Sequence, residues 1–454
     1  MSGILFGEAE LRRVAERALK EAKGDGAEAL VIARTGALTR YANAAIHQNV
    51  ISREVDVRIR VVIGKRQATA TTNRLDDEGI RRAAEFAGEL ARRAPEDPKF
   101  AGLPDARPIP KAPSSYLERT AEATPLDRAR AAKLICDAAR TAKLVCAGFV
   151  ATNVQEIAVA STHGVWAYAP QTDAETQIAA IGDEGSAFAQ RVSLDFGTLD
   201  VEGAAREAVS KAAKAQRPRD IEPGALEVVL EPYAVRDIVG FLGSAFGALS
   251  VEEGRSFIGG KLGQKVTGPV TLVDDPYDPA AMPRAFDFEG QPSERVTLLE
   301  NGIARAVVYD SGTAHRAGVR NTGHALPTNP FAPAMPMHAR LEPGDRSIEE
   351  LVKSVKRGLL VTRFHYTRWV HQLKTIVTGM TRDGTFAIVD GEIAYPVKNL
   401  RFTQSYHEAL GGTLGIGRDL SLLVSGEQFG LTTSCQRIPA LHLQTFNFTG
   451  ATRY

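Results

Sequence analysis

Apolar residues recur along the chain with two spacings, one typical of helices and one typical of strands. Helical spacing predicts helices over residues 8–23, 76–93, 124–145, 201–216 and 233–249. From residue 54 to residue 64, apolar and polar positions alternate strictly, which predicts a half-buried strand with antiparallel neighbours. Shorter apolar runs predict strands over residues 27–34 and 226–230.

Capping residues and prolines mark where these elements begin and end. Asp76 precedes one helix, and Thr124, Pro125 and Asp127 form a capping-box pattern at the start of another. Six prolines lie between residues 95 and 113, where each removes a backbone donor. We therefore expect a linker there.

Three dipeptides in the C-terminal half predict hairpin turns: Asn301-Gly302, Asp383-Gly384 and Asp390-Gly391. These residue pairs tolerate the positive φ angles of tight hairpins. The sequence therefore predicts an α+β fold, with N-terminal α/β units followed by an antiparallel β-rich C-terminal domain. We expect an α/β domain over residues 1–95, a proline-rich linker over 96–123, a middle α+β domain over 124–219 and the β-rich domain over 220–454.

Composition narrows the classes of partner. The 454 residues include 55 Lys and Arg against 54 Asp and Glu, a formal charge of +1, so no net attraction to nucleic acid is expected. Three cysteines are too few for a disulfide framework and indicate a reducing compartment. The N-terminal residues do not follow the pattern of a signal peptide, and no apolar run is long enough to cross a membrane. We expect a cytoplasmic protein.

Local motifs for catalysis are missing. Residues 254–262 do not fit a phosphate-binding loop, because Gly260 occupies the position of its Lys and Leu262 is not Ser or Thr. Gly411 stands where a zinc-protease helix starting at His407-Glu408 would need its second histidine. The polar stretch at residues 309–325 has the composition of a loop that binds a peptide or an anion, with a solvated connector as the alternative. Its candidate substrate-binding residues are His315, Arg316, Arg320, Asn321 and His324.

A family resemblance begins in residues 38–73. Residues 43–49 read N-A-A-I-H-Q-N, and residues 64–73 read G-K-R-Q-A-T-A-T-T-N. Both stretches, with others spread over nearly the whole chain, resemble the TldD/PmbA family. In that family, zinc metallopeptidases hold their metal with two histidines of an H-E-x-x-x-H helix and a cysteine near the C-terminus, and the glutamate acts as general base.

Aligned with that motif, this chain has Gly240, Phe241 and Ala245 in place of the histidine, glutamate and second histidine, and only Cys435 matches a ligand. A lone cysteine binds zinc weakly, so we expect no catalytic residue and no cofactor on this chain. The departure resembles the TldE (PmbA) branch, whose members lack the zinc motif.

The resemblance implies a non-zinc subunit of a cytosolic TldD/TldE-type metallopeptidase, which helps to form a chamber for unfolded or short peptides. It implies a TldD-like zinc-bearing partner, with a homodimer as the alternative when the chain is alone. Two other functions remain open. One is a regulatory binding protein of the DNA gyrase modulator type, and the other is an independent hydrolase that uses Cys435 with His324 or His407.

Overall fold

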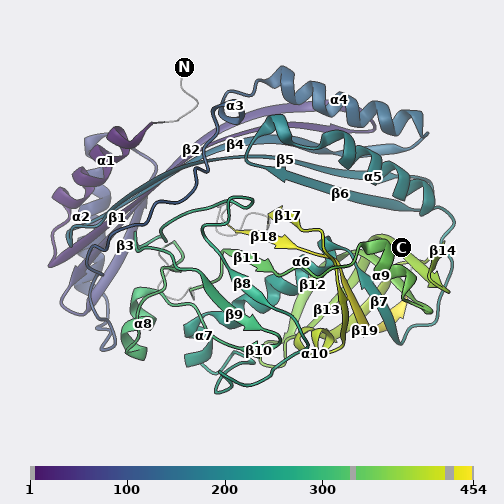
Figure 1. Cartoon of the computed structure of the whole chain (residues 1–454). Coiled ribbons are helices and arrows are strands. Elements are labelled where there is room, and N and C mark those ends of the chain that lie inside the picture. The colour runs from purple at the N-terminus through teal and green to yellow at the C-terminus, as the bar shows by residue number, and fades with distance from the viewer. Residues whose placement is uncertain (1–5, 328–333, 425–433, 452–454) are drawn as a thin grey trace.

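A long, curved sheet carries helices on its outer face and arches over the C-terminal part of the chain (Figure 1). This computed structural model describes residues 6–327, 334–424 and 434–451. Two further sheets lie below the arch. The fold is α+β with mostly antiparallel sheets, as predicted.

The arching sheet has the strand order β3-β2-β1-β4-β5-β6, and every neighbouring pair is antiparallel. Its strands are β1 (Gly26–Ala42), β2 (Ala45–Ile63), β3 (Arg66–Thr72), β4 (Val145–Ser161), β5 (Trp166–Ile181) and β6 (Ser186–Ser193). The two ranges predicted as N-terminal and middle domains therefore contribute strands to one sheet. β1 joins them, because it pairs with β2 on one side and with β4 on the other.

Four helices cover the outer face of this sheet in two pairs. The helices α1 (Glu8–Glu21) and α2 (Asp77–Arg93) lie at one end, and α4 (Pro125–Thr141) and α5 (Val201–Lys214) lie at the other. The predicted caps are present: the Asp76 carboxylate accepts from the Gly79 amide, and Thr124 and Asp127 form a reciprocal capping box. The opposite face of the sheet packs Leu30 and Val159 against phenylalanines of the C-terminal part.

The helix predicted over residues 124–145 ends earlier, at Thr141. Lys143 takes a positive φ of 57°, and Val145 already pairs with Ile181 as the first residue of β4. Cys146 therefore lies in a strand rather than at the end of the helix. It is buried with Cys136, and their sulfur atoms are 3.9 Å apart. Between α2 and the short helix α3 (Glu118–Ala121), the proline-rich segment forms no helix or strand, as expected.

Two sheets make up the C-terminal part. One has the order β10-β9-β8-β11-β18-β17, and the other has the order β12-β7-β19-β15-β13-β14 with β16 paired to β19. Only β11 with β18 and β7 with β12 pair in parallel among these strands. The strands are β7 (Ala225–Leu230), β8 (Leu272–Asp274), β9 (Val296–Glu300), β10 (Ile303–Ala304), β11 (His338–Leu341), β12 (Arg357–His371), β13 (Ile376–Val389), β14 (Glu392–Pro396), β15 (Leu400–Ser405), β16 (Thr413–Ile416), β17 (Ser421–Val424), β18 (Cys435–Ile438) and β19 (Leu441–Ala451).

Short helices connect these strands: α6 (Pro232–Gly243), α7 (Ala248–Glu252), α8 (Ser311–Ala317), α9 (Ile348–Lys353) and α10 (Tyr406–Gly411). The helix predicted over residues 233–249 is broken into α6, a 3₁₀ turn at Ser244–Phe246 and α7. The break lies at Gly247, whose extended backbone (φ −78°, ψ 134°) interrupts the helical hydrogen bonds. A second 3₁₀ turn, Phe196–Thr198, precedes α5.

Two of the three predicted hairpins are confirmed. Asn301-Gly302 joins β9 to β10, and Asp390-Gly391 joins β13 to β14, with positive φ at all four residues. The prediction for Asp383-Gly384 is wrong, because this pair lies inside β13. Its positive φ angles produce a bulge in the pairing with β12, where the Asp383 carboxylate accepts a hydrogen bond from Arg363.

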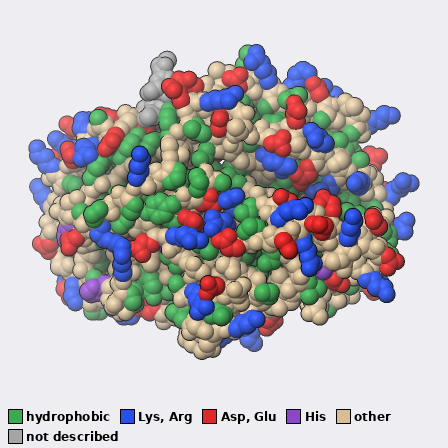
Figure 2. Space-filling view, in the orientation of Figure 1, with side chains coloured by type: hydrophobic (Ala, Val, Ile, Leu, Met, Phe, Trp, Pro, Cys, Tyr) green, Lys and Arg blue, Asp and Glu red, His purple; other side chains and the backbone are tan. Residues whose placement is uncertain are grey.

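Acidic and basic side chains are interspersed over the visible face, without a large region of one sign (Figure 2). This mixture agrees with the formal charge of +1. No helix within the described ranges has the length and apolar character needed to cross a membrane.

Candidate functional site

The three positions aligned with the zinc motif lie at or near a cleft of about 450 Å³ between α6, β11, β12 and β18. Gly240 and Phe241 line this cleft, together with Cys435. Ala245 is buried in the 3₁₀ turn that follows α6. Gly240 and Cys435, almost 200 positions apart in sequence, meet here because α6 packs against β11 and β18, which pair in parallel.

The side chains present do not fit a hydrolytic zinc ion. Gly240 has no side chain, and the Phe241 ring contacts the Trp369 ring edge to face, with centroids 4.8 Å apart. A catalytic zinc needs about three protein ligands and an open position for water. Within the part of the chain that the structure describes, no three His, Cys, Asp or Glu side chains are grouped so that they could hold a metal ion.

Cys435, the first residue of β18, is 1% exposed and packs with Ala281, Met282 and Val424. Burial raises the pKa of its thiol to about 12. Thiolate is the nucleophilic form of cysteine, so this side chain is poorly suited to attack a substrate at neutral pH.

Cys435 should therefore resist alkylation in the native protein. We expect negligible labelling of Cys435 by iodoacetamide at pH 8 within a time that labels it completely in denaturant. Mass spectrometry of the digested protein measures this directly. Rapid labelling of the native thiol would contradict the burial described here.

The two histidines proposed as partners of Cys435 bind other groups. Nε2 of His324 lies 3.0 Å from the Asp274 carboxylate and Nδ1 lies 3.0 Å from the Thr322 hydroxyl, so both of its ring nitrogens have oxygen partners. His407 lies 2.8 Å from the Thr375 hydroxyl through Nδ1, and its ring stacks on Phe257. The structure therefore gives no support to a cysteine–histidine pair.

His324 belongs to a buried polar cluster that the sequence did not reveal. Asp274 is fully buried and accepts hydrogen bonds from His324 and from the His338 backbone amide. Burial raises the pKa of Asp274, but these interactions outweigh burial and hold it below its usual value. Burial lowers the pKa of His338 to about 4. The cluster is a structural element in the interior.

The other candidate binding residues lie on or after α8, so part of the segment predicted as a loop is helical. His315 is exposed, and Arg320 forms an exposed ion pair with Glu294 at 2.7 Å. Asn321 donates to the Ser311 hydroxyl at 2.8 Å and accepts from the Gly323 amide, which fixes the backbone after the helix. These residues do not converge on one point.

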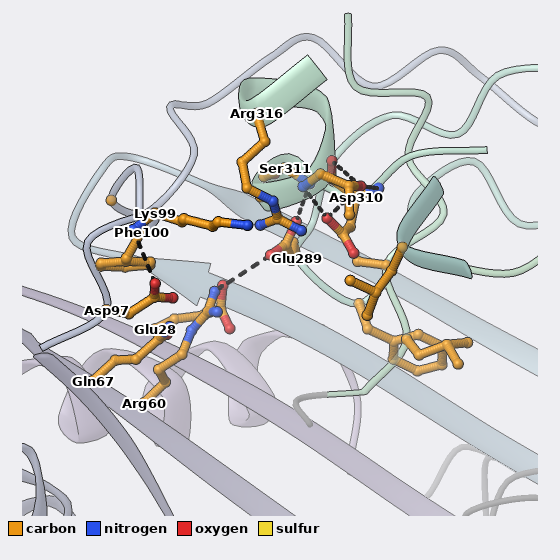
Figure 3. A pocket seen from close by; sticks show the side chains of 17 residues that line it. Glu28, Arg60, Gln67, Asp97, Lys99, Phe100, Glu289, Asp310, Ser311 and Arg316 are labelled. Atoms are coloured by element: carbon orange, nitrogen blue, oxygen red, sulfur yellow. Dashed lines mark hydrogen bonds and ion pairs between the residues drawn. The ribbon is translucent and has the colours of Figure 1, made fainter. Parts of the chain in front are cut away.

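Arg316 does line a pocket, a polar one of about 120 Å³ between the arching sheet, the proline-rich linker and the C-terminal part (Figure 3). Arg60 of β2 also lines it. Its guanidinium is 2.7 Å from the Glu28 carboxylate of β1 and 3.6 Å from the Glu289 carboxylate of the C-terminal part. Glu289 also accepts from the Ser311 amide at 3.1 Å.

Each basic side chain that lines this pocket forms an ion pair. At its rim, Lys99 and Arg316 both bind Glu252, at 3.2 Å and 2.8 Å. Burial raises the pKa of Glu28, although Arg60 opposes this shift. The arrangement joins three segments that are far apart in sequence, and we interpret it as a link between the sheet and the C-terminal part rather than as a ligand site.

Sequence reasoning missed most of the walls of the larger cleft. Trp369 lies on β12, Met335 and Met337 lie at the entry to β11, and Gln436 follows Cys435 on β18. No local pattern distinguishes these residues, because pairing between distant strands brings them together. Of these residues, only Gln436 could have been suspected from the sequence, because it follows Cys435, which the alignment with the zinc motif indicated.

Comparison with known proteins gives matches along most of the chain. Models of the PmbA/TldA metallopeptidase family match in three parts: domain 1 at residues 27–91, the central domain at 111–216 and the C-terminal domain at 223–450. Metalloprotease PmbA of Escherichia coli O157:H7 is 24% identical over 438 residues, which are 90% of this chain and 92% of that protein. A metalloprotease of Methanothermobacter thermautotrophicus is 29% identical over 226 residues, only 49% of each chain.

Solved structures share the fold. TldE from Thermococcus kodakarensis has a TM-score of 0.87 at 21% identity and covers 97% of this chain and 100% of its own. A protein of Thermotoga maritima, described as a putative modulator of a DNA gyrase, has a TM-score of 0.84 at 19% identity with the same coverage.

Proposed function

Because the chain belongs to the PmbA/TldA metallopeptidase family, we propose that it is the non-zinc subunit of a two-chain peptidase, paired with a TldD-like subunit that carries the zinc. The observation that carries this proposal is the cleft at the motif positions. A cleft lies at these positions, but Gly240, Phe241 and Ala245 supply no metal ligand and no general base.

In this role the chain contributes binding surface rather than chemistry. Its cleft and the covering sheet form part of a chamber wall that shields an unfolded or short peptide from bulk water. The partner subunit supplies zinc, and zinc polarises the peptide carbonyl and activates water. We place the assembly in the cytoplasm, since three buried free thiols suit a reducing compartment.

Reconstitution tests this proposal. The purified chain alone should hold far less than one zinc ion per chain and should cleave neither casein nor short peptides. Addition of the TldD-like chain from the same genome should give a stable complex with chelator-sensitive cleavage. Metal analysis and a peptidase assay on the separate chains and on the mixture provide the measurement.

A matched pair of variants sharpens the test. Cys435→Ser in this chain should leave the zinc content and activity of the complex unchanged, whereas the equivalent substitution in the partner should remove both. Stoichiometric zinc on this chain alone, or capture of gyrase in preference to the TldD-like chain, would overturn the proposal.

A further inference from the structure

The cleft beside Gly240 has the composition of a binding site in its own right. The Phe241 and Trp369 rings form one wall, and Met335 and Met337 stand at the entry to β11. Leu272 and Leu298 add further apolar surface. Small-molecule sites are mostly apolar concave surfaces of about 300–1,000 Å³, and this cleft, at about 450 Å³, falls within that range.

Gln436 supplies a polar group without a protein partner. Its side chain lines the cleft, the residue is 6% exposed, and the carboxamide oxygen has no hydrogen-bond partner among the described residues. The amide nitrogen of the same group lies 3.4 Å from the position that a Cβ atom on Gly240 would occupy. A buried carboxamide oxygen without a partner is unfavourable. Rotation of the carboxamide brings this oxygen to the side of Gly240, where the nitrogen now lies, so a ligand that donates a hydrogen bond to it gains affinity.

Charged groups at the cleft are already engaged. Arg236 donates to the Val424 carbonyl at 2.9 Å. The Asp237 carboxylate accepts from the Tyr406 hydroxyl at 2.7 Å and from the Thr367 hydroxyl at 2.8 Å. Since Arg236 and Asp237 are adjacent and opposite in charge, the site favours a neutral apolar group over an anion or a cation.

These features together match one kind of ligand. We propose that the cleft binds a large apolar side chain of an extended peptide, while the Gln436 carboxamide hydrogen-bonds the adjoining peptide backbone. This inference rests on the proposed function, in which peptides enter a shared chamber. The absence of a side chain at Gly240 lets a peptide backbone approach α6, and the polarizable methionines adapt to leucine, methionine or phenylalanine.

Capped pentapeptides of the form acetyl-Gly-Gly-X-Gly-Gly-amide provide the probe. The chain has two tryptophans, Trp166 and Trp369, so a Trp166→Phe background reports on the cleft by fluorescence. With X as Leu, Met or Phe we expect saturable binding at least tenfold tighter than with X as Ser or Asp. Equal affinity for all five peptides, or no binding by any, would overturn the proposal.

Variants locate the site. Gly240→Leu should fill the cleft and weaken binding at least tenfold. The variant should still fold, because a Cβ at this position meets only the Gln436 amide, at ordinary contact distance. Gly411→Leu is the matched control, since Gly411 is an exposed glycine with open space around it, outside the cleft. Gln436→Leu should weaken binding of every peptide while keeping the preference for apolar X. Circular dichroism confirms that each variant is folded.

The reconstituted complex separates this inference from the proposed function. In the complex, Gly240→Leu should raise KM for peptides with apolar X and leave kcat unchanged. If the complex cleaves these peptides with an unchanged KM, the cleft proposal is wrong and the subunit role stands. If the chain alone shows the apolar preference but forms no complex with a TldD-like chain, the cleft proposal stands and the subunit role is wrong.

Discussion

Replacement of Arg60 by methionine should destabilise the protein by about 3–5 kcal/mol. The arginine is largely buried and lies between two carboxylates, Glu28 and Glu289, whose side chains are 2% and 14% exposed. Removal of the cation leaves two buried acids without their charge partner, which costs more than the ion pair itself contributes. Urea denaturation at pH 7.5 measures the loss.

A control lies two residues away in the same strand. Arg58 pairs with Asp56 at 2.6 Å, but both side chains are partly exposed, so Arg58→Met should cost less than about 1 kcal/mol. Combining Arg60→Met with Glu28→Gln and Glu289→Gln should restore much of the stability, because no buried charge then remains unpaired. If Arg58→Met and Arg60→Met lower the free energy of unfolding by the same amount, the buried ion pairs of Arg60 with Glu28 and Glu289 do not link the sheet to the C-terminal part.

The loss of stability caused by Arg60→Met should also be smaller at low pH. Burial already raises the pKa of Glu28, and Arg60 is the group that opposes this shift. Without Arg60 the carboxyl takes up a proton more readily, which removes the unpaired charge. Denaturation at pH 5.5 should therefore show a smaller difference from the wild type than denaturation at pH 8.

The wild-type protein should lose stability as the pH rises from about 4 to about 8, and this loss should level off above pH 8. Burial raises the pKa of Asp173 to about 7 and that of Asp287 to about 8. These folded-state values lie above the unfolded value of 3.8, so both groups stabilise the fold at low pH and this contribution is lost as the pH rises through the folded pKa. Each retained proton is equivalent to about 1.4 kcal/mol per pH unit.

The titration of His338 has the opposite effect on stability, and it does so at lower pH. Its folded pKa of about 4 lies below the unfolded value of 6.5, so its contribution is present above pH 6.5 and is lost as the pH falls toward 4. Between pH 6.5 and 4, His338 therefore opposes the two aspartates, and the gain in stability on acidification should be about half of what the aspartates alone would give. Thermal denaturation at half-unit pH steps measures both slopes.

Asp173→Asn isolates the contribution of one of these titrating groups. The Asp173 carboxylate accepts from the Asn153 amide at 2.7 Å, and an asparagine oxygen can accept the same bond without a buried charge. We expect a gain on the order of 2–4 kcal/mol at pH 8 and little change at pH 4.5. Asp183→Asn, in the exposed turn after β5, is the control and should change stability by less than about 0.5 kcal/mol. A pH-independent effect of Asp173→Asn would contradict the assigned titration.

Local signals predicted the elements whose chemistry is local. The caps at Asp76 and Thr124 and the turns at Asn301 and Asp390 depend only on neighbouring residues, and all four are present. The lengths of β1 and β2 were not predictable in the same way. Residues 45–54 of β2 are exposed, so no hydrophobic alternation marks them, and pairing with β1 alone keeps them extended.

The residues of the candidate site also fall into two groups, those that the sequence indicated and those that it did not. The resemblance to a known family, which the family models confirm, pointed to Gly240, Phe241 and Cys435, and the structure brings all three to one cleft. The position of Trp369 in the cleft and the Arg60 to Glu289 contact arise from pairing and packing between segments far apart in sequence. A single sequence carries no local trace of such contacts.

The position of β19 in its sheet bears on how the protein is made. β19 follows every other strand in the chain, yet it pairs with β7, β15 and β16. On the ribosome, the arching sheet has all of its strands by residue 193, whereas β7 and β15 keep unpaired edges until residues 441–451 emerge. Unpaired strand edges invite aggregation. The sheet that contains β19 thus exposes unpaired strand edges until the end of synthesis.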